Sequence, residues 1–181
     1  MPDVLWTIGH STRTIDEFVS LLKARDIQQL VDIRTIPRSR HNPQFNTETI
    51  SRSLKKEGLL YEHMPQLGGL RKPKKDSINA GWRNASFRGY ADYMQTEQFG
   101  RALDELMANS KERKTVIMCA EAVPWRCHRS LIADALVMRD WEIRHIMSEE
   151  RADRHQLRSF ARVKNGLIHY PDLNVGPQLF P

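Results

Sequence analysis

Cysteine is scarce in this chain, and long apolar runs are missing from it. The two cysteines among 181 residues are too few for the disulfide framework of a small secreted domain. No stretch approaches the roughly 20 apolar residues of a membrane-spanning helix. The first residues have neither the basic region nor the apolar core of a signal peptide. We therefore expect a cytoplasmic protein that does not associate with a membrane.

Internal repeats and linkers are missing as well. Hydrophobic residues make up 40% of the chain and charged residues 28%, which is typical of a globular domain of this length. We expect residues 1–165 to form one domain. Residues 166–181 are rich in proline and are expected to form an extended tail that packs on the domain or on a partner, where Leu179 and Phe180 would need a pocket. The chain is expected to be a monomer or a homodimer.

Apolar runs and helical periodicities alternate along the sequence. Strands are predicted at residues 4–8, 29–33, 59–63, 115–118 and 143–147. Helices are predicted after the capping box Thr14–Glu17, around Ile50 and Leu54 up to Gly58, after Thr96, over 131–136 and over 153–163. Because parallel strands need crossover helices, this order predicts a single α/β domain. Its sheet is expected to be mostly parallel, with about five strands and helices on both faces.

A net charge of +6 favours an anionic ligand, namely a phosphate, a nucleotide or a nucleic acid. In open α/β sheets, ligands bind beyond the carboxyl ends of the strands. The loops expected there contain the residues predicted to bind the ligand: Ser11, Arg34, Arg38, Arg40, Gly68, Gly69, Arg126 and Arg129. Gly68-Gly69 is not a phosphate-binding fingerprint, and the sequence identifies no cofactor.

Both cysteines fall in one segment, Cys119 to Arg129, directly after the most apolar predicted strand. We expect Cys119, Glu121, His128 and, from the first loop, His10 to be the catalytic residues. One interpretation is a nucleophilic or redox thiol, activated by a helix N-terminus and by arginine. A second is a metal site of Cys119, Cys127 and His128, and a third is that both thiols are buried packing residues. The seven-residue spacing from Cys119 to Arg126 and the missing glycines argue against a tyrosine-phosphatase loop.

Several segments, in order, carry a family resemblance. They are Thr7 to Ser11, Val31 to Arg34 with Pro37 to Arg40, Leu67 to Gly69, Phe87 to Met94, and the Cys-x4-Pro-x2-Cys-His-Arg element ending at Arg129. In these the chain resembles the domain of unknown function 488 family. The resemblance implies a compact single-domain α/β protein and does not imply a reaction.

Two functions from different classes fit these observations. The first is an enzyme acting on a phosphate-bearing ligand, with Cys119 or Glu121 as nucleophile or base and a histidine moving a proton. The alternative is a non-catalytic nucleic-acid-binding protein, in which Trp125 or Tyr90 stacks on bases. A third option is a Cys/His metal-binding protein. Trp82 is expected to pack in the core. The combination of thiol, carboxylate and imidazole in one loop favours the enzyme.

Overall fold

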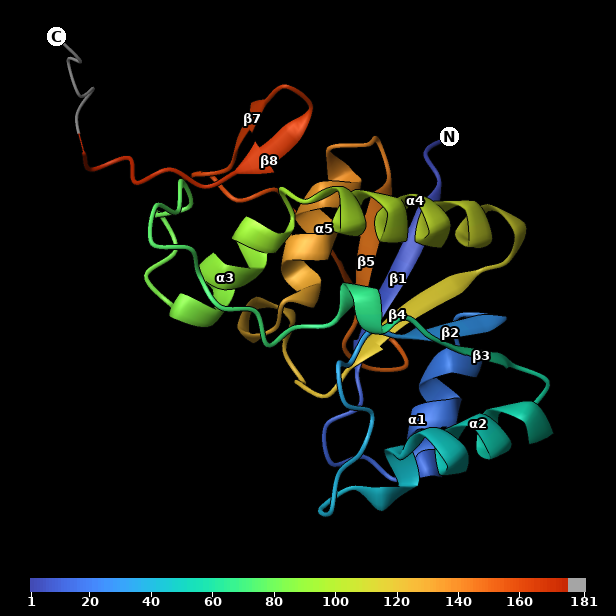
Figure 1. Ribbon diagram of the computed structural model, residues 1–181. Coiled ribbons are helices and arrows are strands. Elements are labelled where there is room, and N and C mark those ends of the chain that lie inside the picture. The colour runs from blue at the N-terminus through green and yellow to red at the C-terminus, as the bar shows by residue number, and fades with distance from the viewer. Residues whose placement is uncertain (176–181) are drawn as a thin grey trace, which may run out of the picture.

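The computed structural model describes residues 1–175, which form a mixed α/β domain (Figure 1). The strands are β1 (Val4–Gly9), β2 (Gln29–Asp32), β3 (Leu60–His63), β4 (Thr115–Cys119), β5 (Glu142–Ile146), β6 (Ala152–Arg154), β7 (Arg162–Lys164) and β8 (Leu167–His169). The helices are α1 (Ile15–Lys23), α2 (Thr47–Lys56), α3 (Ala85–Tyr93), α4 (Glu97–Glu112) and α5 (Arg129–Val137). Short 3-10 turns lie at Pro43–Phe45, Pro65–Leu67 and Pro124–Arg126.

The main sheet has the strand order β3-β2-β4-β1-β5-β6. The first five strands in that order are parallel to one another, and β6 pairs antiparallel with β5. This confirms the predicted α/β class and the mostly parallel sheet, to which β6 adds an antiparallel edge. β7 and β8 form a separate hairpin.

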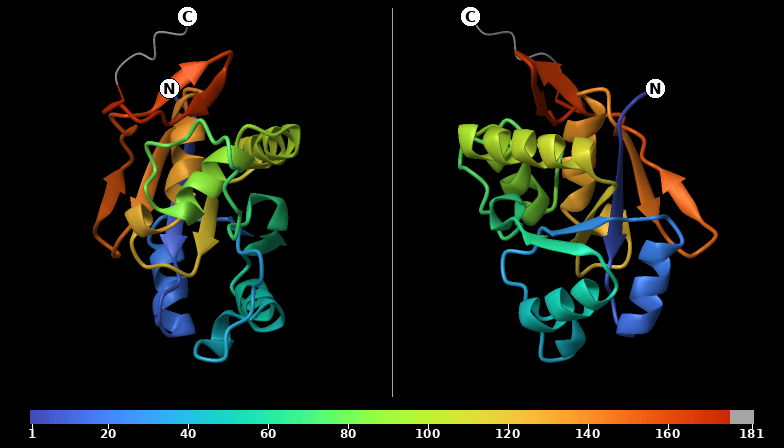
Figure 2. Two further views of the ribbon diagram at one scale, coloured as in Figure 1. Left: turned by 60° about the vertical axis from the view of Figure 1, so that its left-hand side comes forward. Right: turned by 90° about the vertical axis from the view of Figure 1, so that its right-hand side faces the viewer.

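Helices cover both faces of the sheet (Figure 2). Helices α1 and α2 pack on one face against Ile8, Leu30 and Met118, whereas α3, α4 and α5 pack on the other against Val31 and Ile117. Both faces are therefore buried, which explains why the strands are continuous apolar runs.

The chain crosses from one face to the other between its two halves. The connections β1–β2 and β2–β3 run through α1 and α2, and those from β3 to β4 and from β4 to β5 run through helices on the opposite face. β1 and β4 are neighbours in the sheet, yet their outgoing loops lead to helices on different faces. Such a point in an open α/β sheet is where ligands bind.

Local signals for helix ends are confirmed in the structure. The side chain of Thr14 accepts the backbone N–H of Glu17, whose carboxylate accepts the N–H of Thr14 in return. The hydroxyl of Thr96 accepts the N–H of Phe99 at the start of α4. Gly58 follows α2 with φ of +75°, a conformation that glycine adopts without strain.

The predicted helix over 153–163 is wrong. Its first residues extend β6 along β5, and its last residues form β7, which pairs with β8. Leu157, whose position suggested an apolar helix face, is exposed, and Phe160 packs separately against Trp82 and Tyr170. Pairing with the sheet edge therefore prevails over a weak helical pattern.

Helix α3 was not predicted from periodicity. Gly89 lies inside it, and a Cβ at this position would lie 2.2 Å from the carbonyl oxygen of Arg71. The glycine lets the loop backbone cross the helix, at the expense of helix propensity. Trp82, just before α3, packs against Phe87 and Tyr170, so its predicted place in the core is confirmed.

The described part of the tail is anchored to the domain. Ile168 of β8 is buried, and Tyr170 is fully buried with its hydroxyl donating to Asp134 at 2.7 Å. The expected pocket for Leu179 and Phe180 lies outside the described residues. No helix within residues 1–175 is long and apolar enough to cross a membrane.

Candidate functional site

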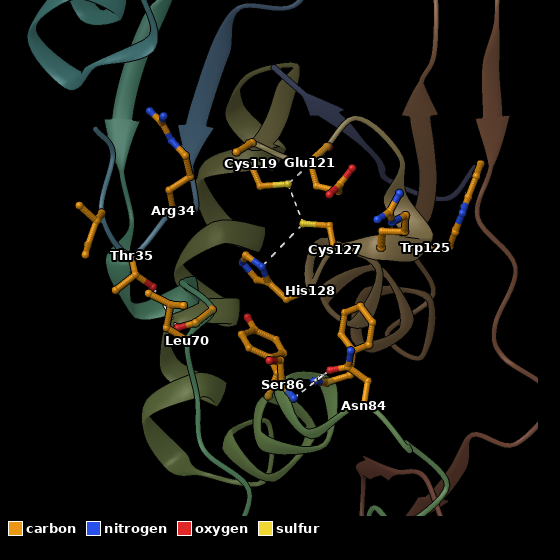
Figure 3. A pocket seen from close by; sticks show the side chains of 16 residues that line it. Arg34, Thr35, Leu70, Asn84, Ser86, Cys119, Glu121, Trp125, Cys127 and His128 are labelled. Atoms are coloured by element: carbon orange, nitrogen blue, oxygen red, sulfur yellow. Dashed lines mark hydrogen bonds between the residues drawn. The ribbon is translucent and has the colours of Figure 1, made fainter. Parts of the chain in front are cut away.

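The two cysteines meet where β4 ends and α5 begins. The alternation of β4 places Ile117 and Cys119 on the side of α3, α4 and α5. Cys127 immediately precedes His128, the residue that caps α5. The two Sγ atoms lie 2.6 Å apart, and Cys119 and Cys127 are free thiols (Figure 3). The two cysteines are eight residues apart in the sequence, and the loop between them brings their sulfurs into contact.

Arg129 connects this thiol pair to the loop that follows β4. Its side chain is 1% exposed, and its guanidinium donates to the Sγ of Cys119 at 2.8 Å and to the carbonyl of Ala122 at 2.9 Å. It also donates to the carbonyl of Glu121. Of these acceptors only the thiol can become an anion. A buried cation favours a neutralising partner, so the arrangement favours a Cys119 thiolate.

The two thiols have opposite acidities. Burial raises the pKa of Cys119, but hydrogen bonds from Cys127 and Arg129 and the charge of Arg129 together lower that pKa to about 7. Burial raises the pKa of Cys127 well above the ordinary value, and the neighbouring Cys119 sulfur raises it further. Near neutral pH Cys119 is therefore the thiol that ionises, while Cys127 keeps its proton.

His128 lies next to the pair in a neutral state. Its Nε2 faces the carbonyl oxygen of Ile33 at 3.3 Å and its Nδ1 faces the Sγ of Cys127 at 3.7 Å. Because Nε2 must carry the proton to donate to a carbonyl, Nδ1 presents a lone pair to Cys127. Burial lowers the pKa of His128 to about 4. The ring of Tyr90 packs against it at 4.9 Å.

A cavity of about 600 Å³ opens beside the thiols, and we call it the thiol pocket. Its lining includes Cys119, Cys127, His128, Glu121, Arg126, Gly69, Asn84, Ser86, Phe87 and Tyr90. Three exposed apolar side chains also line it: Ile36 at 65%, Leu70 at 80% and Trp125 at 60% exposure. In Figure 3, Leu70 and Trp125 lie on opposite sides of the thiols. The volume suits a small-molecule ligand with an apolar body.

A second cavity of about 420 Å³, the His10 pocket, lies on the α1–α2 side. His10, Ser11, Arg38 and Asn42 line it, and Glu121 lines both cavities. The backbones that separate the cavities are in contact, because the N–H of His10 donates to the carbonyl of Cys119 at 2.9 Å. The predicted loops therefore share one sheet edge, but their residues are divided between two cavities.

His10 belongs to the second cavity and is neutral. Its Nδ1 donates to the carbonyl of Ser11 at 2.7 Å, and its Nε2 accepts from Arg34 at 3.3 Å. The ring stacks on Phe45 with centroids 4.3 Å apart. Burial lowers the pKa of His10 to about 4. His10 does not line the thiol pocket.

Arg34 lines both cavities but uses its charge inside the protein. Its Nε and Nη2 donate to the two carboxylate oxygens of Asp32 at 2.9 and 2.6 Å. Nη2 also donates to the carbonyl of Phe45 at 2.7 Å, and the guanidinium points away from Cys119 in Figure 3. Bidentate pairing with a fully buried carboxylate neutralises Arg34 before any ligand arrives.

The family is decided by comparison with known proteins. The family model described as "Domain of unknown function DUF488" matches residues 14–136, which is more than half of the chain. The chain belongs to this family. The match contains Cys119, Cys127 and Arg129 and begins after His10. No curated protein and no solved structure matches the chain.

The remaining predicted residues of this family member have different surroundings. Arg126 is exposed and lines the thiol pocket. Arg38 pairs with Glu48 at 3.0 Å, Arg40 is exposed and lines neither cavity, and Arg129 is buried behind the thiols. Of the arginines predicted to bind an anionic ligand, Arg126 is therefore the main one available in the thiol pocket.

The two glycines have separate reasons to be glycine. A Cβ on Gly68 would lie 2.3 Å from the Thr35 hydroxyl, so Gly68 permits close packing of two loops. A Cβ on Gly69 would lie 3.1 Å from Nδ1 of His128. Gly69 therefore leaves room for the imidazole beside the thiols.

The geometry does not suit the metal set. Within residues 1–175, no group of three or more His, Cys, Asp or Glu side chains is placed to hold a metal ion. The two thiols instead contact each other.

Sequence reasoning missed part of the site. Asp32, inside a buried strand, gave no signal that it neutralises Arg34. Ile36, Leu70, Asn84 and Ser86 enter the pocket lining from loops whose contacts depend on the tertiary fold. The sequence does show apolar residues within polar loops. They indicate a binding surface only when the fold brings the loops together.

Proposed function

We propose that the chain is an enzyme that uses the Cys119 thiolate as a nucleophile toward a small ligand bound in the thiol pocket. The observation that carries this proposal is the hydrogen bond of 2.8 Å from the buried Arg129 guanidinium to the Cys119 sulfur. A structural cysteine does not require a buried cation, whereas a nucleophile does benefit from one.

In this proposal each residue has a distinct task. Cys119 attacks an electrophilic atom of the ligand, forming a covalent bond to sulfur. Arg129 is a positioning residue that keeps the sulfur ionised, and Cys127 supplies a second hydrogen bond to it. Glu121, a carboxylate residue that lines both cavities, is the candidate to bind or move a proton on the ligand.

Arg126 and Trp125 suggest what else the ligand carries. The guanidinium of Arg126 is an exposed donor on the pocket lining, which suits an anionic group such as phosphate or carboxylate. Trp125 is 60% exposed beside it and offers a ring face for stacking. A nucleotide combines both features, and so does an aromatic acid.

Nucleic-acid binding without catalysis is less well supported. Arg34 is paired with a buried carboxylate and Arg129 is itself buried, so two of the predicted phosphate contacts are already used. Tyr90 is 1% exposed and donates its hydroxyl to the carbonyl of Leu67. A base therefore finds no free ring face on Tyr90.

The experiment is alkylation of the folded protein with iodoacetamide across a pH series, with the site of labelling read by peptide mass spectrometry. We expect Cys119 to be labelled with a midpoint at about pH 7, and Cys119→Ser to remove that labelling. A phosphate- or carboxylate-bearing aromatic compound is expected to slow it. A midpoint near that of an ordinary thiol, at roughly pH 8.5–9, would reject the proposal.

A further inference from the structure

We propose that Cys119 and Cys127 form a reversible dithiol pair that reduces a small aromatic or aliphatic disulfide. Cys119 attacks the disulfide in the thiol pocket, and Cys127 then releases the bound half. This rests on the proposed function, because it needs Cys119 as the nucleophile. It adds a second catalytic thiol, a reaction class and a substrate class.

The placement of the sulfurs carries the inference. Cys119 ends a central strand and Cys127 immediately precedes helix α5, so both come from the framework of the domain. Their Sγ atoms are 2.6 Å apart, and a disulfide bond requires about 2.05 Å. Only a small local shift therefore separates the dithiol from a bonded pair.

The different acidities of the thiols assign their order. A thiol with a pKa near the ambient pH is the best attacking group in thiol–disulfide exchange. Cys119 meets this condition with its sulfur hydrogen-bonded to Arg129, whereas the Cys127 thiol keeps its proton. Cys119 therefore attacks first, and Cys127 is the resolving thiol, which attacks the mixed disulfide in the second step.

The steps balance in atoms and electrons. The Cys119 thiolate attacks one sulfur of R–S–S–R′, forming the Cys119–S–S–R bond and releasing R′S⁻, which takes a proton from water. Cys127 then attacks the Cys119 sulfur, the bond to the substrate sulfur breaks, and RS⁻ leaves. The substrate gains two electrons and becomes two thiols, while the pair is oxidised to a disulfide. A low-molecular-weight thiol or another protein dithiol restores the reduced pair.

His128 provides an acceptor for the proton of Cys127. Its Nδ1 lone pair faces that sulfur at 3.7 Å, because Nε2 is committed to the carbonyl of Ile33. The proton that leaves Cys127 during its attack passes to the departing RS⁻, and the Nδ1 lone pair orients the Cys127 thiol for that attack. A side chain at position 69 would crowd this nitrogen, with a Cβ at 3.1 Å.

The lining of the pocket defines the substrate class. Ile36, Leu70 and Trp125 are exposed apolar groups around the thiols, and the cavity of about 600 Å³ holds a molecule rather than a folded domain. Arg126 provides a site for an acidic substituent. The expected substrate is therefore a low-molecular-weight disulfide with an apolar body and an acidic group.

The probe is 5,5′-dithiobis(2-nitrobenzoate), an aromatic disulfide with carboxylates, added in excess to reduced protein. Wild-type protein is expected to release two coloured thiolates per chain and to end with a Cys119–Cys127 disulfide in peptide mapping. Cys127→Ser is expected to release one and to retain a mixed disulfide on Cys119. Cys119→Ser is expected to react at least tenfold more slowly.

Two controls separate substrate recognition from the chemistry. Trp125→Ala, on an exposed side chain, is expected to slow the aromatic probe severalfold and to slow 2-hydroxyethyl disulfide clearly less, because that disulfide has no ring to stack on Trp125. Equal slowing with both disulfides would overturn the substrate class. Thermal melting of each variant shows whether it is folded. The peptide map of wild-type protein tests disulfide formation without relying on any variant.

The failures are distinguishable. If wild-type Cys119 stops at a mixed disulfide and Cys127 stays reduced, this inference is overturned and the nucleophile stands. If Cys119 reacts neither in folded wild-type protein nor in the folded Cys127→Ser variant, both the inference and the proposed function are overturned. If Cys127 is the residue that holds the probe in wild-type protein, the assigned order is overturned.

Discussion

Arg129→Met should make Cys119 an ordinary, weakly reactive thiol. Arg129 is the only cation that donates a hydrogen bond to this sulfur within residues 1–175, at 2.8 Å, and burial alone raises the pKa of the thiol. Without the guanidinium the hydrogen bond from Cys127 remains, so we expect the pKa of Cys119 to rise from about 7 toward its ordinary value of 9.0, by at most about two units. Two pKa units correspond to about 3 kcal/mol of stabilisation of the thiolate.

The magnitude of the rate change follows from the thiolate fraction. At pH 7 that fraction falls from about one half to about one hundredth, a change of roughly 50-fold. The more basic thiolate is intrinsically more nucleophilic by roughly six- to tenfold, because the Brønsted coefficient is about 0.4–0.5. For the full two-unit shift the alkylation rate at pH 7 is therefore expected to fall by roughly five- to eightfold, and the midpoint of its pH profile to rise by up to about two units.

The assay is iodoacetamide labelling of the reduced protein with both thiols present, in which peptide mass spectrometry reads the label on Cys119 separately from any label on Cys127. Arg129→Lys keeps a charge but loses the planar donor geometry, so an intermediate midpoint is expected. Arg139→Met, just beyond the same helix, is the matched control and should leave the profile unchanged. An unchanged midpoint in folded Arg129→Met would refute the reasoning.

Three further predictions concern the framework of the site. Asp32→Asn leaves the buried Arg34 without its carboxylate and should lower the free energy of unfolding by roughly 3–5 kcal/mol in urea denaturation; a loss below 1 kcal/mol would show that the pair contributes little. Gly9→Ala should destabilise by roughly 3 kcal/mol or more, because its Cβ would lie 1.8 Å from a backbone carbonyl oxygen. Gly100→Ala, in open space on α4, should stabilise by roughly 0.5–1 kcal/mol, and similar melting shifts for both glycines would contradict this contrast. Burial lowers the pKa of His10 to about 4, so between about pH 6.5 and 4 the unfolded chain binds more protons than the folded one, and the free energy of unfolding falls as the pH drops. His10→Asn should weaken this pH dependence. Urea denaturation at a series of pH values checks this, and the same pH dependence in variant and wild type would disprove it.

The fold could be predicted where its signals are local. Apolar runs such as Thr115 to Met118 are buried on both faces and have no competing interpretation. Capping residues such as Thr14 mark helix starts through their own hydrogen bonds. Helix α3 and β6 to β8 could not be predicted in this way, because Gly89 and the residues around Leu157 take their conformation from neighbouring segments.

The position of the candidate site was also accessible from sequence, and its electrostatics were not. The order of strands and helices placed four loops at one sheet edge, which the two cavities confirm. Charge counting then assigned Arg34 and Arg129 to a ligand. The side chains instead contact Asp32 and Cys119, and such pairings depend on distances that a sequence does not contain.

The most direct measurement is a titration of thiolate ultraviolet absorbance in reduced wild-type protein and in Cys119→Ser. We expect one thiolate to appear with a midpoint at about pH 7 in the wild type. The same transition should be absent from folded Cys119→Ser, because the remaining Cys127 thiol keeps its proton to high pH. A single transition near pH 9 in both proteins would contradict the claim that Cys119 is an activated nucleophile.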